Sequence, residues 1–158
     1  MKDWNSVFDG ILTERQFKVN EPMNRHNTYG IGGPADVFVM PQPEDQLKQV
    51  LRRADELHIP VTVIGGGSNS LISDRGIRGI TLCTARMKSS TVRKGNQIIV
   101  TGGAGTGAVS RFAMKEGLSG LEFAAGIPGT LLGAVFMNAN GYGSKFANVV
   151  HSVRTVTR

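Results

Sequence analysis

The sequence predicts an α+β fold, because stretches with the period of an amphipathic helix alternate with short apolar strands. The clearest helix opens at Pro43 and has His58 in its last turn, and its apolar residues recur every three or four positions: Leu47, Val50, Leu51, Ala54 and Leu57. Pro60 prevents its continuation, and Val61–Ile64 then forms a short apolar strand. Residues 91–101 predict a β-hairpin, since two strand-like runs flank a Lys-Gly-Asn turn.

The other elements are expected in the following order along the chain. Helices are predicted over residues 3–16, 106–116 and about 128–137, and strands over 35–40 and 79–83. Residues 149–158 alternate between apolar and polar side chains, which predicts a final strand. A terminal strand of this kind usually pairs with one further along, so we expect a fragment or an unusually short product.

Composition favours a soluble globular protein with a small anionic ligand. Of the 158 residues, 40% are hydrophobic and 19% are charged, and the net charge is +6. The basic residues are scattered and only 6% of residues are aromatic, so no nucleic-acid partner is expected. No apolar run approaches the roughly 20 residues of a membrane span, and the N-terminus lacks a signal peptide's apolar region. We therefore expect a cytoplasmic protein that contacts no membrane.

The metal-ligating residue types form no site. Cys83 is the only cysteine, which excludes an internal disulfide, and its strand-like surroundings predict a small buried side chain. The three histidines, His26, His58 and His151, show no spacing typical of a metal site. Glu122 is expected to be a buried acceptor for backbone N–H groups rather than a general base. We expect no metal.

Glycine clusters carry most of the functional signal. Gly65-Gly66-Gly67-Ser68-Asn69 follows an apolar strand directly, and successive N–H groups of such a loop can bind an anion. The alternative is a tight turn between two strands. No Gly-Lys-Ser/Thr sequence follows, which excludes a P-loop.

Two later clusters offer similar geometry. In VTGGAGTGA, Gly103, Gly105 and Ala108 match the dinucleotide fingerprint G-x-G-x-x-A, but the preceding strand looks like half of a hairpin, so a Rossmann fold is a minor alternative. AAGIPGTLLGA leads into a helix whose N-terminus is suited to phosphate, or which is simply packed tightly in the core. Together the three clusters predict a dinucleotide cofactor held outside the Rossmann pattern.

Three long motifs identify a family resemblance. NTYGIGGPADVFVMP, VIGGGSNSLISDRGIRGI and GLSGLEFAAGIPGTLLGAVFMNANGYG closely resemble the UDP-N-acetylenolpyruvylglucosamine reductase family from about Pro22 to Val150. The resemblance implies a two-lobed α+β FAD-binding domain of the vanillyl-alcohol oxidase (PCMH) type, with the substrate-binding domain missing. It places an N-terminal helix and lead-in at 1–21 and the domain at 22–158, with lobe one at about 22–84 and a truncated lobe two at about 85–158.

The resemblance also implies the cofactor and its ligands. In the family, the loop matching Gly65 to Asn69 wraps the FAD pyrophosphate, and the stretch matching Gly126 to Thr130 helps from the other lobe. The expected FAD-binding residues are Gly65, Gly66, Gly67, Ser68, Asn69, Gly126, Ile127, Pro128, Gly129, Thr130, Asn138 and Tyr142. Tight, non-covalent FAD, NADPH as reductant, a UDP-sugar substrate and a monomeric state follow from the same resemblance.

The implied activity is the reduction of UDP-N-acetylglucosamine enolpyruvate to UDP-N-acetylmuramate for peptidoglycan synthesis. The family's catalytic arginine, serine and glutamate match no residue of this chain, so no catalytic residue is assigned and the chain is expected to be an incomplete catalyst.

Leu132 replaces a family glycine, which predicts a crowded cofactor or a strained backbone angle, and Asn140-Gly141 exchanges the positions of the unhindered backbone. These departures favour an alternative, a flavin-free binding module of the same fold.

Overall fold

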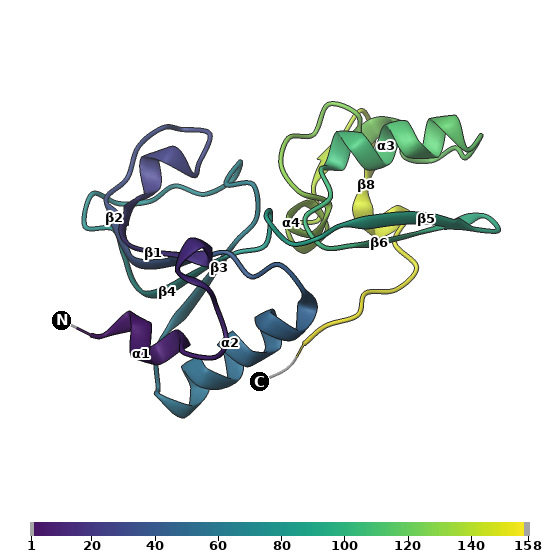
Figure 1. Cartoon of the computed structure of the whole chain (residues 1–158). Coiled ribbons are helices and arrows are strands. Elements are labelled where there is room, and N and C mark those ends of the chain that lie inside the picture. Colours follow the sequence, from purple (N-terminus) through teal and green to yellow (C-terminus); the bar gives the residue numbers. More distant parts are fainter. Residues whose placement is uncertain (1, 157–158) are drawn as a thin grey trace. The chain divides into compact units, whose positions relative to one another are not determined.

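A computed structural model of the chain describes residues 2–156, which form two compact units that meet in sequence at Met87 and Lys88 (Figure 1). Unit 1 contains the described residues up to Met87 together with Val156, and unit 2 is Lys88–Thr155. The predicted domain limits at residues 22 and 84 remain predictions. None of the described helices has the length and apolar character that crossing a membrane requires.

Unit 1 is built on a four-stranded sheet in the order β1-β2-β4-β3. Its strands are β1 (Phe17–Pro22), β2 (Pro34–Val39), β3 (Val61–Ile64) and β4 (Ile77–Cys83). β1 pairs antiparallel with β2, whereas β4 pairs in parallel with both β2 and β3. Because parallel strands need a crossover, helix α2 (Glu44–Glu56) carries the chain from β2 to β3.

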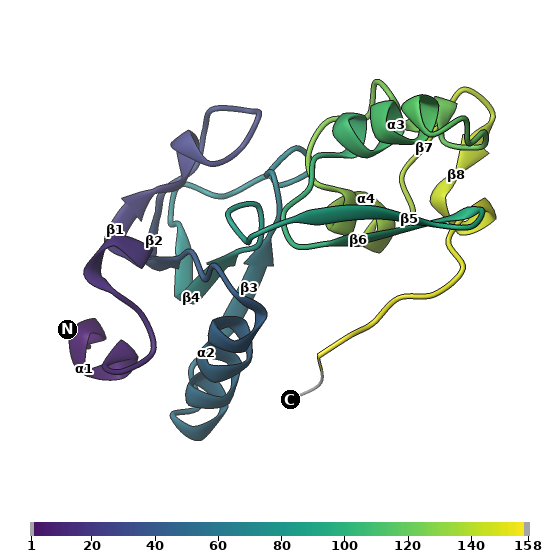
Figure 2. The ribbon, with the colours of Figure 1, turned by 45° about the vertical axis from the view of Figure 1, so that its right-hand side comes forward.

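The main core of unit 1 lies between this sheet and two helices, α2 and α1 (Trp4–Phe8), which lie on the same side of the sheet (Figure 2). Val50 and Ala54 of α2 are fully buried against Ile80 and Leu82 of β4, as the apolar stripe of α2 predicts. A second cluster includes Met23, Ala35, Phe38, Ile64, Ile72 and Cys83. The prediction that Cys83 is a small buried residue is confirmed.

The predicted helix over residues 3–16 is wrong in length. Asp3 caps α1 by accepting hydrogen bonds from the N–H groups of Asn5 and Ser6. The helix ends at Phe8, and Gly10 follows with φ +68°, a left-handed angle typical of a residue just beyond a helix. A 3₁₀ turn at Glu14–Gln16 follows before β1.

Residues 65–76 join β3 to β4, and their course excludes the tight-turn alternative. β3 and β4 are parallel neighbours, so the chain must travel back along the sheet before it re-enters. Gly67 has φ +71°, and a Cβ atom at this position would overlap the carbonyl oxygen of His26. Thr28 N–H also donates to the Gly67 carbonyl at 3.3 Å. The glycine loop is therefore held by direct backbone contact with residues 26–28.

Unit 2 begins with the predicted hairpin. β5 (Ser90–Lys94) and β6 (Gln97–Thr101) pair antiparallel, and α3 (Thr106–Lys115) follows. The antiparallel pairing overturns the Rossmann alternative, which requires a parallel sheet around the G-x-G-x-x-A stretch.

A small core closes the second half of unit 2. It contains Phe123, Ala124, Ala134 and Phe146. Around it lie 3₁₀ turns at Glu122–Ala124 and Phe146–Asn148, helix α4 (Leu131–Phe136), and the two-residue strands β7 (Asn140–Gly141) and β8 (Ser144–Lys145).

Two predictions fail in unit 2. The helix predicted from about Pro128 begins only at Leu131, because Thr130 caps it: the Thr130 hydroxyl accepts a hydrogen bond from Gly133 N–H. The strand predicted over 149–158 is absent from residues 149–156, the part of that stretch that the structure describes. An alternating pattern forms a strand only when another strand pairs with it, and no described strand does so here.

Shortening Leu82 tests the unit 1 core. Leu82→Ala should lower the free energy of unfolding by about 2–5 kcal/mol, because the side chain is fully buried and its loss leaves a cavity. The control Leu71→Ala removes a side chain that is 76% exposed and should change stability by no more than about 0.5 kcal/mol. Urea denaturation followed by circular dichroism measures both, and equal midpoints would contradict the packing.

Adding a methyl group at Gly67 tests the contact between the glycine loop and residues 26–28. Gly10→Ala is a matched control, because Gly10 has nearly the same φ, +68°, but has no atom within 4 Å of an added Cβ. In the control, the free energy of unfolding should fall by about 1–2 kcal/mol, the cost of a left-handed backbone angle at an alanine. In Gly67→Ala it should fall further, and the difference reports the overlap with the His26 carbonyl. Calorimetric unfolding of both variants measures this difference, and equal losses would show that the loop does not press on His26.

Candidate functional site

The parallel strands of unit 1 place a group of side chains and loops at one edge of the sheet. β2, β3 and β4 run in the same direction, so their carboxyl ends meet there. Gly65 directly follows β3, and Ala85 and Arg86 come just after β4. Ligands of parallel sheets bind outside this edge, because loops and unused main-chain groups converge there.

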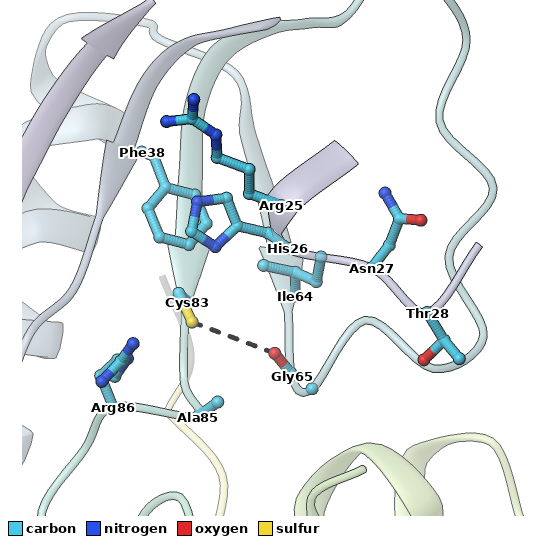
Figure 3. Close-up of a pocket in the computed structure, with 11 residues that line it drawn as sticks. Arg25, His26, Asn27, Thr28, Phe38, Ile64, Gly65, Cys83, Ala85 and Arg86 are labelled. Atoms are coloured by element: carbon cyan, nitrogen blue, oxygen red, sulfur yellow. Dashed lines mark hydrogen bonds between the residues drawn. The ribbon is translucent and has the colours of Figure 1, made fainter. Parts of the chain in front are cut away.

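A pocket of about 270 Å³ lies at this edge (Figure 3). Phe38, Ile64 and Cys83 supply apolar surface, and Arg25 and Arg86 supply positive charge. The complete lining is Arg25, His26, Asn27, Thr28, Phe38, Ile64, Gly65, Gly66, Cys83, Ala85 and Arg86. The pocket thus combines an apolar wall with two cations and the first two glycines of the loop.

The glycine loop presents main-chain donors that the fold does not use. Within residues 2–156, none of the N–H groups of Gly65–Asn69 donates a hydrogen bond to another residue. Gly66 and Asn69 are exposed, whereas Gly67 is buried. The loop is therefore anchored at Gly67 and offers its N–H groups to a ligand, the arrangement that binds anions.

The segment before the pocket is fixed by Asn27. Its side-chain amide donates to the carbonyls of Met23, at 2.7 Å, and Ile31, at 2.8 Å. Its oxygen accepts from Gly30 N–H at 2.9 Å, and Gly30 has the left-handed φ of +68°. Asn27 and Gly30 thus form one hydrogen-bonded turn.

A buried carboxylate lies beside the pocket. Glu21 Oε1 is 2.8 Å from Nε2 of His26 and accepts a hydrogen bond from Lys18 Nζ at 3.2 Å. Burial pushes the pKa of Glu21 upward, but the hydrogen bonds from His26 and Lys18 and the charges of both side chains outweigh it. The pKa of Glu21 is therefore below its ordinary value of 4.5. The carboxylate stays ionised at neutral pH.

Cys83 lies in the pocket wall but is not a nucleophile. Burial raises the pKa of its thiol, against weaker hydrogen bonds from the main chain of Ala85 and Arg86. Its Sγ lies 3.9 Å from the carbonyl oxygen of Gly65. A protonated thiol in this position packs as a small apolar group.

The second group of predicted binding residues lies in unit 2, around the start of α4. Thr106 N–H donates to the Gly129 carbonyl at 3.0 Å, and Leu131 N–H donates to the Ala104 carbonyl at 2.9 Å. These two hydrogen bonds hold the loop before α4 against the residues at the start of α3. Ile127 N–H is used by the Ala124 carbonyl, and Pro128 has no N–H. Among the described residues, the N–H groups of Gly126, Gly129 and Thr130 have no acceptor.

The remaining predicted binding residues, Asn138 and Tyr142, follow α4. Both have left-handed backbone angles, with φ +46° and +49°. The Asn138 side chain is partly used by the fold, because its oxygen accepts from Ala147 N–H at 2.9 Å. The Tyr142 side chain is 92% exposed and free to contact a ligand.

Leu132 does not strain the backbone, so the strained-angle alternative is wrong, whereas crowding of the cofactor stays a prediction. Leu132 lies within α4 at ordinary helical angles, and neither Asn140 nor Gly141 has a left-handed φ. The sequence also allowed this helix to be packed tightly in the core, and that alternative is wrong. Only Ala134 of α4 is buried, while Leu132 and Phe136 are exposed.

Glu122 accepts a backbone hydrogen bond, as predicted, but its side chain is not buried. It accepts from Gly120 N–H at 2.8 Å, and it is exposed. No other role follows from its contacts.

The sequence-based list missed several pocket residues. Arg25, His26, Phe38 and Arg86 line the pocket but were not among the candidates. Phe38 and Arg86 lie just before and just after the carboxyl ends of the parallel strands β2 and β4, which is the signal that could have found them. Arg25 and His26 follow the antiparallel strand β1 and carry no such signal. The candidates Gly65–Asn69 belong to unit 1, and all the others belong to unit 2.

Comparison with protein families gives one match over most of the chain. Residues 35–158 match the family described as FAD binding domain. The UDP-N-acetylenolpyruvoylglucosamine reductase of Clostridioides difficile (strain 630) is 44% identical over 144 residues, which is 91% of this chain and 47% of that protein. The reductase of the same name from Geobacillus kaustophilus (strain HTA426) is 43% identical over 93% of this chain and 48% of its own length. The chain thus spans about half the length of the curated relatives it matches.

Solved structures agree with this match. UDP-N-acetylenolpyruvylglucosamine reductase (MurB) from Thermus caldophilus superposes with a TM-score of 0.61 at 29% identity, over 82% of this chain and 44% of that one. p-Cresol methylhydroxylase superposes with a TM-score of 0.52 at 16% identity, over 73% of this chain and 25% of that one, which shows a shared fold alone.

These matches confirm the resemblance noted in the sequence. They also confirm the predicted fold class, an α+β FAD-binding domain of the vanillyl-alcohol oxidase (PCMH) type. With residues 35–158 matched, the chain belongs to the FAD binding domain family.

Proposed function

We propose that the chain is the FAD-binding portion of a UDP-N-acetylenolpyruvoylglucosamine reductase, and that Gly65–Asn69 hold the pyrophosphate of FAD. One observation carries the proposal: five consecutive N–H groups that have no acceptor among the described residues lie beside a pocket at the carboxyl ends of three parallel strands. Such N–H groups match the oxygens of a diphosphate, which accept hydrogen bonds and carry negative charge. The relatives' shared name and the family match support the cofactor and the reaction.

The charges of the pocket favour the same ligand. Arg25 and Arg86 line it, and Glu21, the nearby carboxylate, is paired with Lys18 and hydrogen-bonded to His26. A diphosphate would therefore meet a positive surface, which strengthens its hydrogen bonds to the loop. We also assign residues of unit 2 to FAD binding. They are the N–H groups of Gly126, Gly129 and Thr130, the side chains of Ile127, Asn138 and Tyr142, and Pro128.

The residues of this chain bind and orient the cofactor, and we assign none of them to proton or hydride transfer. The cofactor supplies redox chemistry: in the proposed reaction a hydride that comes from NADPH and a proton are added across the double bond of the enolpyruvyl group of a UDP-sugar, which yields UDP-N-acetylmuramate for peptidoglycan. We further propose that FAD is held tightly without a covalent bond, and that the chain is a cytoplasmic monomer that needs further catalytic residues for turnover.

A series of flavins tests the role of the diphosphate. FAD contains the diphosphate, FMN has a single phosphate and riboflavin has none, so affinity should fall in that order. We expect FAD to bind at least about tenfold more tightly than FMN, the equivalent of about 1.4 kcal/mol. Isothermal titration calorimetry of the purified chain with each flavin measures the three dissociation constants.

Two arginine variants are the matched controls for this series. Arg86→Gln removes a charge that lines the pocket and should weaken FAD about two- to fivefold, because an exposed charge is screened by solvent. Arg52→Gln removes an equal charge from the exposed face of α2 and should leave FAD binding unchanged. Equal affinity for FAD and riboflavin would contradict the diphosphate role, and a chain that binds no flavin would favour the flavin-free binding module.

A further inference from the structure

Glu21 is a charged residue in an unusual place. It lies on β1 opposite Ala35 of β2, and its side chain is only 9% exposed. A buried carboxylate is costly unless hydrogen bonds satisfy it, and here both partners come from nearby in the chain, Lys18 and His26. Neither Glu21 nor His26 was a predicted binding residue, and the proposed function assigns neither of them a contact with FAD.

The partner histidine is held on a second side by an aromatic ring. The imidazole of His26 stacks on the ring of Phe38, with 4.0 Å between the ring centroids and 25° between the planes (Figure 3). Phe38 is almost fully buried in the sheet, so it cannot move easily. The imidazole of His26 is therefore held by the Glu21 carboxylate and by the buried ring of Phe38.

The main chain of His26 supports the glycine loop. The His26 carbonyl lies where a Cβ atom of residue 67 would be, and two residues later Thr28 N–H donates to the Gly67 carbonyl. A shift of residues 26–28 must therefore shift Gly67, and with it the neighbouring N–H groups of the loop. This chain of contacts runs from Glu21 through His26 to the loop, entirely within unit 1.

We infer that Glu21 and His26 form a positioning pair, which holds residues 26–28 so that the glycine loop keeps the conformation that receives a diphosphate. This inference rests on the proposed function for the ligand, but the pair's effect on the loop does not depend on a ligand. Neither residue touches the diphosphate in this account. Removing the carboxylate should therefore loosen the loop first and weaken FAD as a consequence.

The experiment compares Glu21→Ala and Glu21→Gln in the full chain. The amide of glutamine keeps an oxygen acceptor for His26, whereas alanine keeps none. The control is Glu56→Ala, which removes an exposed carboxylate paired with Arg53 on α2. For each protein, NMR measures amide hydrogen exchange at Thr28 and across β2 and β4 without ligand, and calorimetry measures the dissociation constant for FAD.

Glu21→Ala should speed exchange at Thr28 and weaken FAD, each about tenfold, because a hydrogen bond to a charged group is lost. Glu21→Gln should keep both the slow exchange at Thr28 and the FAD affinity close to their wild-type values. Glu56→Ala should change neither the exchange nor the affinity. Should Glu21→Ala fail to fold, His26→Ala gives the same two measurements, since it removes the other member of the pair and keeps the carboxylate.

Three results would overturn the pair. They are unchanged exchange at Thr28, exchange that rises equally across β2 and β4, and a glutamine variant that behaves like alanine. A fourth result separates the two proposals: faster exchange at Thr28 in a chain that binds no FAD even as wild type would support the positioning pair and contradict the proposed function.

Discussion

Parallel pairing of β4 with both β2 and β3 is the constraint on which the unit 1 site depends. It brings the carboxyl ends of three strands to one edge, and it forces residues 65–76 to travel back along the sheet instead of turning tightly. The pocket forms where these strands end, because Phe38, Ile64 and Cys83 come from three different strands and meet there. No local segment of the chain could form this site by itself.

The glycine triplet serves two physical needs at once. Gly67 is required by the fold, because its φ is left-handed and a Cβ atom there would overlap the His26 carbonyl. Gly65 and Gly66 line the pocket, and their N–H groups remain available to a ligand. A loop that is rigid at one residue and open at its neighbours is preorganised, so an anion that binds there does not have to order the loop. The buried Glu21–His26 pair extends this rigidity into the core.

Local sequence patterns predicted some parts of this structure well. α2, β3 and the β5–β6 hairpin each carry their own signal, in a helical stripe, an apolar run or a turn sequence. The helix over 3–16 and the strand over 149–158 failed because their outcome depends on the backbone angle of Gly10 and on a pairing partner, which periodicity does not contain. The glycine motif located the loop, but it could not find Arg25, His26 or Arg86, since non-local strand pairing brings them to the pocket. Leu132 was expected to crowd the cofactor or to strain the backbone, and it lies at ordinary helical angles, which a motif comparison cannot reveal.

The central claim is that main-chain N–H groups of Gly65–Asn69 hold the diphosphate of FAD. Phosphorus–nitrogen couplings across hydrogen bonds test it most directly, because they appear only when a phosphate oxygen accepts from a particular amide. The account predicts that the isotope-labelled chain saturated with FAD shows such couplings for amides of Gly65–Asn69. Bound FAD whose phosphorus couples only to amides elsewhere, with the loop resonances unchanged from the free protein, would contradict it.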